Sequence, residues 1–140
     1  MTHKTPASTF RSRARQVHEK LGATVALLCA GHPRSRNYRA WTYPFRASSH
    51  FLYLTGLQIP GAVLLLKDGQ SKVFVPRPDD DDPLWHGTLP TLDELRAVSG
   101  ADSVQYLDEL GSVLPSSPAR SDIATLAPQE HVTAAWLSSI

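Results

Sequence analysis

The sequence predicts an α/β domain in which helices flank both faces of a mixed β-sheet. Segments with the apolar patterns of strands alternate along the chain with segments that have the 3.6-residue period of helices. Two of the strand-like segments are separated by Asp68-Gly69, which is typical of an antiparallel hairpin. The length of 140 residues suits one domain. We therefore expect a single unit over residues 1–140, with residues 1–7 as a loose arm.

The first expected elements are a helix and a buried strand. Ser8 can cap a helix over residues 8–21, whose apolar residues recur at helical spacing, and Gly22 can end it. The arginines of this helix favour a solvated face over a nucleic-acid site, because the interleaved aromatic residues of such a site are missing. Residues 23–30 form a continuous apolar run, which predicts a buried strand parallel to a neighbour.

A second interior strand is expected directly after a small polar turn. The serines at residues 48–49 can turn the chain through hydrogen bonds from their side chains to the backbone. Over residues 51–55 the aromatic pattern predicts a strand with Phe51, Tyr53 and Thr55 on one face and leucines on the other. Since both faces are apolar, we expect this strand to be covered on both sides.

The C-terminal half begins with the hairpin, for which residues 62–66 and 72–75 are the expected strands. Thr91 and Glu94 form a capping box, which predicts a helix that ends at Gly100. The remaining expected elements are a strand over residues 103–107, a short helix capped by Asp108, a strand over residues 122–127 and a helix over residues 129–140.

Composition excludes several functions. A net charge of +1 provides no long-range field for nucleic acid or an anionic membrane. The single cysteine, Cys29, excludes an intrachain disulfide and fits a reducing compartment. No apolar run approaches the roughly 20 residues of a membrane span. The start of the chain also lacks the apolar core of a signal peptide. We expect a cytoplasmic domain with neither nucleic acid nor membrane as partner.

The sequence lacks most of the residue motifs that are typical of a catalytic or metal site. The six histidines are scattered, and no zinc or serine-hydrolase motif is present. The four aspartates of residues 79–82 are adjacent rather than spaced for convergence, so a solvated acidic turn is preferred to a metal site. Cys29 is interpreted as a core residue, because burial disfavours the thiolate that a Cys–His nucleophile needs.

Two places remain as candidates for recognition. Arg46 is favoured as a structural arginine that holds its loop through hydrogen bonds, although its planar guanidinium also suits a substrate carboxylate. Trp85, next to His86, follows the proline-bounded acidic run. An exposed recognition tryptophan and a tryptophan folded back onto the sheet are equally compatible with that position.

Several motifs in order resemble one family. They are F-R-x-S-S-x-F-x-Y-L-T-G at residues 45–56, Pro60-Gly61-Ala62, Val73-Phe74-Val75-Pro76, Leu84-Trp85-x-Gly87 and Gly100-Ala101-Asp102. Over residues 11–127 the chain is similar to the N-terminal domain of the aminopeptidase P, prolidase and creatinase family. This chain has Ala47 and His86 where the family commonly has a glutamine and a charged residue, respectively.

The resemblance implies an Xaa-Pro peptidase whose chemistry lies in another domain. In relatives a pita-bread catalytic domain follows and binds two metal ions, commonly manganese, through Asp, His and Glu ligands. We expect that domain after residue 140, with proline-containing peptides as substrates of the parent protein, and we expect this chain alone to be inactive. The alternatives are a domain of a creatinase-like hydrolase or pseudoenzyme, or a free-standing binding module.

The resemblance also implies a role between subunits. In relatives the N-terminal domain packs against a neighbouring subunit of a homo-oligomer and helps to wall its active site. Trp85, His86 and, in a companion loop, Gln58 are the matching positions in this sequence. Such residues would narrow the pocket and exclude long substrates, which is a specificity function rather than catalysis.

Overall fold

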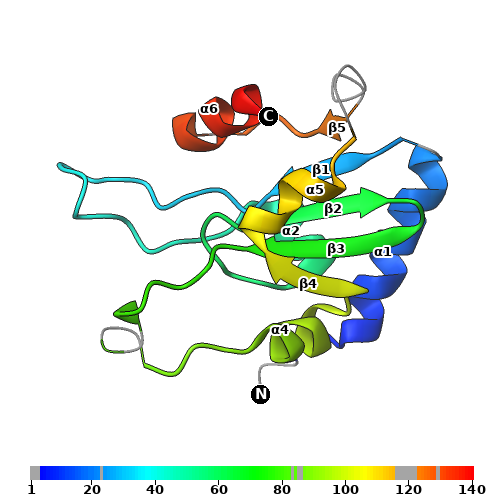
Figure 1. Cartoon of the computed structure of the whole chain (residues 1–140), viewed down its shortest axis with the longest axis horizontal. Helices are drawn as coiled ribbons and strands as arrows, with labels where there is room; N and C mark the ends of the chain where they lie inside the picture. Colours follow the sequence, from blue (N-terminus) through cyan, green and yellow to red (C-terminus); the bar gives the residue numbers. More distant parts are fainter. Residues whose placement is uncertain (1–3, 23, 83, 85–86, 116–122, 129) are drawn as a thin grey trace.

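The fold is a five-stranded mixed sheet with helices on both faces, as the sequence predicts (Figure 1). This computed structural model describes residues 4–22, 24–82, 84, 87–115, 123–128 and 130–140. The strands are β1 (Ala26–Cys29), β2 (Val63–Lys67), β3 (Gln70–Val75), β4 (Ser103–Tyr106) and β5 (Ala124–Thr125). Their order is β4-β3-β2-β1-β5. The pairs β1–β2 and β2–β3 are antiparallel, whereas β1–β5 and β3–β4 are parallel.

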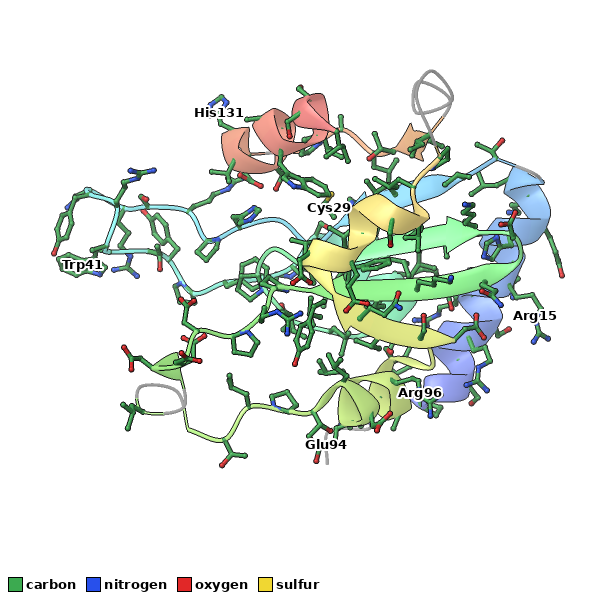
Figure 2. All side chains as sticks on the ribbon, viewed as in Figure 1. Arg15, Cys29, Trp41, Glu94, Arg96 and His131 are labelled. Atoms are coloured by element: carbon green, nitrogen blue, oxygen red, sulfur yellow. The ribbon has the colours of Figure 1, made fainter. Side chains whose placement is uncertain are left out.

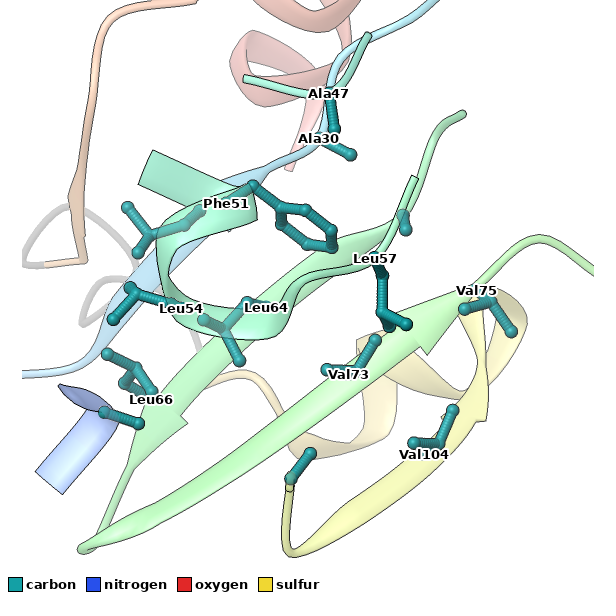
Figure 3. Packing of buried hydrophobic residues seen from close by; sticks show 14 of the residues in the cluster. Ala30, Ala47, Phe51, Leu54, Leu57, Leu64, Leu66, Val73, Val75 and Val104 are labelled. Atoms are coloured by element: carbon teal, nitrogen blue, oxygen red, sulfur yellow. The ribbon is translucent and has the colours of Figure 1, made fainter. Parts of the chain in front are cut away.

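One face of the sheet carries the larger core. Side chains that alternate along β2 and β3, such as Leu64 and Val73, pack there against three helices (Figure 3). The helices are α1 (Ala7–Leu21), α2 (Ser49–Thr55) and α4 (Leu92–Ser99). Phe51 of α2 is fully buried at the centre of this cluster.

The opposite face carries a second, smaller core. The intervening strand residues Leu65 and Phe74 are fully buried there. They pack in one cluster with Leu110 and Trp136. The covering elements are the 3₁₀ turn η1 (Leu107–Glu109), α5 (Leu110–Val113) and α6 (His131–Ser139). Both faces of the central strands are therefore covered, which explains their continuous apolar sequences.

The strand expected over residues 51–55 is wrong, because this segment is helix α2. A helix puts Phe51, Leu54 and Thr55 on one side, and all three are buried. Tyr53 is 54% exposed, whereas a strand would have placed it on the same face as Phe51. Gly56 ends the helix in the left-handed conformation, at φ 67°. A segment of seven residues is too short for its sequence to distinguish the 3.6-residue period of a helix from the 2-residue period of a strand. The burial of one side of the segment favours the helix.

The local signals of the hairpin and of α4 are confirmed. Asp68 and Gly69 both have positive φ, at 51° and 74°, as a two-residue turn of type I′ requires. The hydroxyl oxygen of Thr91 accepts from the Glu94 N–H, and the Glu94 carboxylate accepts from the Thr91 N–H at 2.8 Å. Gly100 then ends α4 in the left-handed conformation.

Several element boundaries differ from expectation. Helix α1 begins at Ala7 after the extended Pro6, so Ser8 lies inside the helix, and Ala7 belongs to the helix instead of the expected arm. Asp108 does not cap a helix; it pairs with Arg77 at 2.9 Å, and η1 begins at Leu107. The strands β1 and β5 are shorter than the segments expected over residues 23–30 and 122–127. Only the residues that pair with a neighbouring strand belong to the observed strands. Strand β1 is parallel to β5, as expected, but antiparallel to β2.

Candidate functional site

A polar hollow lies where β1 ends. Its volume is about 370 Å³, and three segments line it: the loop after β1, the start of α2 and the chain that leads into α6. The polar side chains of its wall include His32, Arg46, Ser48, His50, Glu130 and Thr133. Cys29 also contributes to the lining, at the end of β1 (Figure 2). This hollow gathers the side chains with acid–base or hydrogen-bonding capacity at one end of the sheet.

Arg46 lines this hollow, but it is exposed rather than buried. Its Nη1 donates to the Ala47 carbonyl at 3.3 Å and to the Ser49 hydroxyl at 3.2 Å. Both partners belong to its own loop. The loop turns toward α2 at this point, and the guanidinium is left facing solvent. Both contacts are therefore local to residues 46–49.

Gln58 lies in the loop that follows α2 and is exposed. Its Oε1 accepts a hydrogen bond from the Ala47 N–H at 2.9 Å. This bond ties the loop before α2 to the loop after it, so Gln58 and the Arg46 loop form one unit. The sequence placed the two residues in separate motifs, and only the folding of α2 brings them together.

Trp85 and His86 lie outside the described residues. The acidic run before them forms a turn in which the Asp82 carboxylate accepts from the Asp79 N–H at 2.8 Å, and Asp79, Asp80 and Asp81 are exposed. On either side of the pair, Leu84 is 81% exposed and Gly87 has an open left-handed backbone at φ 73°. The segments that flank Trp85 and His86 therefore face solvent.

Three side chains anchor α6 to the loop after β1, and sequence reasoning missed them. The His32 Nδ1 lies 3.1 Å from the Thr133 hydroxyl and 3.5 Å from the Glu130 carboxylate. The Thr133 hydroxyl donates to the same carboxylate and is almost fully buried. Glu130 also accepts from the Val132 and Thr133 N–H groups, as an N-cap. About one hundred residues separate His32 from this cap, so no local pattern signals the pairing.

Two groups in the hollow could suggest nucleophilic chemistry, and their environments disfavour it. Burial raises the pKa of the Cys29 thiol to about 12, and the nearby Glu130 carboxylate adds to the effect. The thiol therefore stays protonated at neutral pH. The Ser48 hydroxyl donates to the Cys29 carbonyl at 2.6 Å, so His50, whose Nε2 lies 3.1 Å from that hydroxyl, is its donor rather than its base. Burial also lowers the pKa of His50.

In the part of the chain that the structure describes, no group of three or more His, Cys, Asp or Glu side chains is arranged to hold a metal ion. None of the helices there combines the length and the apolar character needed to cross a membrane.

The sequence model of the family described as aminopeptidase P, N-terminal domain, matches residues 10–126 of this chain. The chain belongs to this family. The matched range agrees with the resemblance noted over residues 11–127. The aminopeptidase P N-terminal domain therefore accounts for the fold and for the order of the motifs along the chain.

Relatives carry this domain within longer proteins. The chain is 30% identical over 118 residues to the Xaa-Pro aminopeptidase of Haemophilus influenzae, covering 80% of this chain and 27% of the relative. It is 28% identical over 124 residues to the human Xaa-Pro dipeptidase, covering 82% and 25%. A structure of Escherichia coli aminopeptidase P shares the fold, with a TM-score of 0.73 and 22% identity, covering 97% of this chain and 32% of that one. The chain thus spans 18–27% of the length of these and the other curated relatives that it matches.

Proposed function

We propose that this chain is the non-catalytic N-terminal domain of an Xaa-Pro peptidase. In this role it shapes an active site that another domain carries, and it mediates assembly of a homo-oligomer. The family match over residues 10–126, on a chain that spans 18–27% of the length of its curated relatives, carries the proposal. The hollow supports it too, because its thiol and serine lack the activation that a nucleophile needs.

The chemistry would belong to a catalytic domain that follows residue 140. That domain would hold two divalent metal ions, with manganese the first to test, and would act on proline-containing peptides in the cytoplasm. The described residues of this chain offer no ligand group for those ions. Helix α6 would lead toward the catalytic domain, and its anchor on His32, Glu130 and Thr133 would fix the direction in which the chain leaves the sheet.

The pocket-shaping role is assigned to Trp85, His86 and Gln58, with Arg46 as the support of the Gln58 loop. Leu84 and Gly87, the described residues that precede and follow Trp85 and His86, are both exposed, which supports the assignment. Gln58 is exposed, and its amide is positioned by the Ala47 N–H. Side chains in such places can contact a neighbouring active site without contributing to the core of their own domain.

The experiment compares Trp85→Ala with Leu84→Ala in the full-length parent enzyme. We expect Trp85→Ala to raise KM, lower kcat, or both, for an Xaa-Pro peptide. Its free energy of unfolding in the 140-residue chain should change by about 0.5 kcal/mol or less, as for surface residues. Leu84→Ala is the matched control, because it removes an exposed apolar side chain next to Trp85 and should leave the kinetics unchanged.

Two results would contradict the proposal. One is a loss of about 3–5 kcal/mol in the Trp85→Ala chain with normal kinetics in the parent, since that is the signature of a core aromatic residue. The other is peptidase turnover by the purified 140-residue chain with manganese, in proportion to chain concentration. The coding sequence after residue 140 adds an independent check, because a catalytic domain with its metal ligands in order is expected there.

A further inference from the structure

The polar hollow at the end of β1 has the size of a site for a small molecule. Its volume of about 370 Å³ lies in the lower part of the range that is usual for ligand pockets. Arg46 contributes to its wall from the loop before α2, and Leu126 and Pro128 contribute from the chain that leads into α6. The proposed function does not use this hollow as a binding site. Its charges and its apolar surface indicate the kind of ligand that it would hold.

The Arg46 guanidinium is a hydrogen-bond donor in this wall with unused capacity. An arginine side chain carries five N–H groups. Among the described residues, both hydrogen bonds that Arg46 donates, to the Ala47 carbonyl and to the Ser49 hydroxyl, come from Nη1. The edge formed by Nε and Nη2 therefore has no acceptor in that part of the chain. This edge presents two parallel N–H groups, which match the oxygens of a carboxylate.

A second arginine of the same chain shows what this edge binds. The Nε and Nη2 groups of Arg77 donate to the Asp108 carboxylate at 3.1 and 2.9 Å. Arg46 is exposed like Arg77, but within the described ranges no acidic side chain forms an ion pair with it. A carboxylate from outside the chain would complete the pair that Arg77 makes internally.

The acidic side chain in the wall, Glu130, is already occupied. Its carboxylate accepts from the N–H groups of Val132 and Thr133 and from the Thr133 hydroxyl, and it lies 3.5 Å from the His32 Nδ1. Because a carboxylate offers about four acceptor positions, Glu130 has little capacity left for an ammonium group of a ligand. Its negative charge also disfavours a ligand with a second anionic group. The wall therefore favours a monocarboxylate without an ammonium group.

An apolar surface belongs to the same hollow. Leu126 is 51% exposed and lines the hollow together with the exposed Ala127 and the half-buried Pro128. A ligand with an apolar group would remove this surface from water, which is favourable. The expected ligand thus combines one carboxylate with a small apolar body.

We propose that the hollow binds the C-terminal residue of a short peptide, or an N-acylated amino acid of the same chemistry. The carboxylate pairs with Nε and Nη2 of Arg46, and the apolar side chain packs against Leu126. A peptide C-terminus has the required pattern, because an amide replaces the ammonium group and the side chain lies on the carbon next to the carboxylate. This site goes beyond the proposed function, since it needs neither the catalytic domain nor a second subunit.

The test titrates the isotope-labelled 140-residue chain with N-acetyl-L-leucine and follows its amide signals by NMR. We expect the signals of the residues that line the hollow to shift, with a roughly millimolar dissociation constant for a ligand of so few atoms. N-acetyl-L-leucinamide, which lacks the carboxylate, should bind at least about tenfold more weakly. Free L-leucine, which adds an ammonium group, and acetate, which lacks the apolar body, should also bind more weakly.

A longer probe distinguishes the two sources of the same chemistry. N-acetyl-glycyl-L-leucine has the same C-terminal residue and one more peptide unit. Tighter binding of this probe than of N-acetyl-L-leucine identifies a peptide terminus as the ligand. Equal binding of the two probes identifies a free N-acylated amino acid.

Variants separate the two parts of the site. Arg46→Gln removes the charged edge and should weaken N-acetyl-L-leucine binding at least about tenfold. Arg15→Gln is the matched control, because Arg15 lies on α1, which contributes no residue to the described wall, and Figure 2 shows it away from Cys29. Leu126→Ser should weaken N-acetyl-L-leucine but leave acetate binding unchanged. The exposure of Leu126 makes this variant compatible with folding.

Three results would overturn the site: no shift at about ten times a millimolar concentration of N-acetyl-L-leucine, equal binding of the acid and its amide, or unchanged binding by Arg46→Gln. Binding of acetate or inorganic phosphate as tight as that of N-acetyl-L-leucine would also overturn it, because the hollow would then be an unselective anion site. These outcomes are separate from the kinetic test of Trp85. A chain that binds none of the probes loses this site and keeps the proposed function.

Discussion

Ser71 and Asp102 form a reciprocal set of hydrogen bonds across 31 residues of sequence. The Asp102 carboxylate accepts from the Ser71 N–H at 2.8 Å and from the Ser71 hydroxyl at 3.1 Å, and the Asp102 N–H donates to the Ser71 carbonyl at 2.9 Å. The parallel ladder between β3 and β4 begins at the next pair, Lys72 and Ser103. This contact therefore defines the register in which β4 joins the sheet.

Asp102→Ala should lower the free energy of unfolding by about 1–3 kcal/mol, because it leaves the polar groups of the buried Ser71 without their acceptor. Urea denaturation monitored by circular dichroism measures this loss. The control is Asp93→Ala, whose exposed carboxylate lies 4.0 Å from Arg96 in α4. We expect the control to lose less than about 1 kcal/mol. Equal losses for the two variants would contradict the assigned role of Asp102.

Phe51 and Tyr53 should differ strongly in their contributions to stability. Phe51→Ala removes a fully buried ring and should cost about 3–5 kcal/mol. Tyr53→Ala removes an exposed ring that stacks with Arg13 at 4.1 Å, and it should cost about 1 kcal/mol or less. Chemical denaturation of the two variants provides the comparison. Similar large losses would match a strand with both rings on one face instead of helix α2.

Gly100→Ala should destabilise the domain more than Gly69→Ala. Both glycines have left-handed φ values, 67° and 74°, so alanine meets the same backbone strain at each. At Gly100 a Cβ would also lie 2.2 Å from the carbonyl oxygen of Ala7, whereas it meets nothing within 4 Å at Gly69. We expect thermal denaturation to show an additional loss of about 1–3 kcal/mol for Gly100→Ala. A smaller loss at Gly100 than at Gly69 would contradict this packing of α1.

Arg46→Ala should have only a modest effect on stability. Its two hydrogen bonds are local and lie at the surface, so the expected loss is about 0.5–1.5 kcal/mol, in contrast to the larger cost of breaking a buried charged bond. Arg15→Ala, on the exposed face of α1, is the control and should lose less. Unchanged stability together with a raised KM in the parent enzyme would indicate that Arg46 contacts the substrate instead of supporting its loop.

Cys29 should react slowly with a thiol reagent at neutral pH until urea unfolds the domain. Its pKa is about 12 in the folded state against an ordinary value of 9.0. The folded state therefore binds the thiol proton more tightly, so this contribution to stability is complete below pH 9 and disappears as pH rises toward 12. Between pH 9 and pH 12, the free energy of unfolding of the wild type should fall faster than that of Cys29→Ala, by about 1.4 kcal/mol per pH unit. The same pH dependence of unfolding in both proteins would contradict the burial of the thiol.

The sequence by itself determined the features whose causes are local. The Asp68-Gly69 turn needs two positive φ angles, and the capping box of Thr91 and Glu94 satisfies backbone groups within one turn of helix. The order of the family motifs can also be identified from the sequence, because each motif is a short run of residues. These local signals are sufficient to predict the mixed sheet, the central hairpin and the family.

Only the tertiary structure decided the features that depend on distant partners. Residues 49–55 became a helix because α1, α4 and the sheet bury Phe51 and Leu54 on one side. Gln58 and the Arg46 loop meet because α2 folds between them. His32 contacts Glu130 and Thr133, which lie about one hundred residues away in the sequence. Pairings between residues so far apart leave no periodic trace in the sequence, since they are set by how the layers pack.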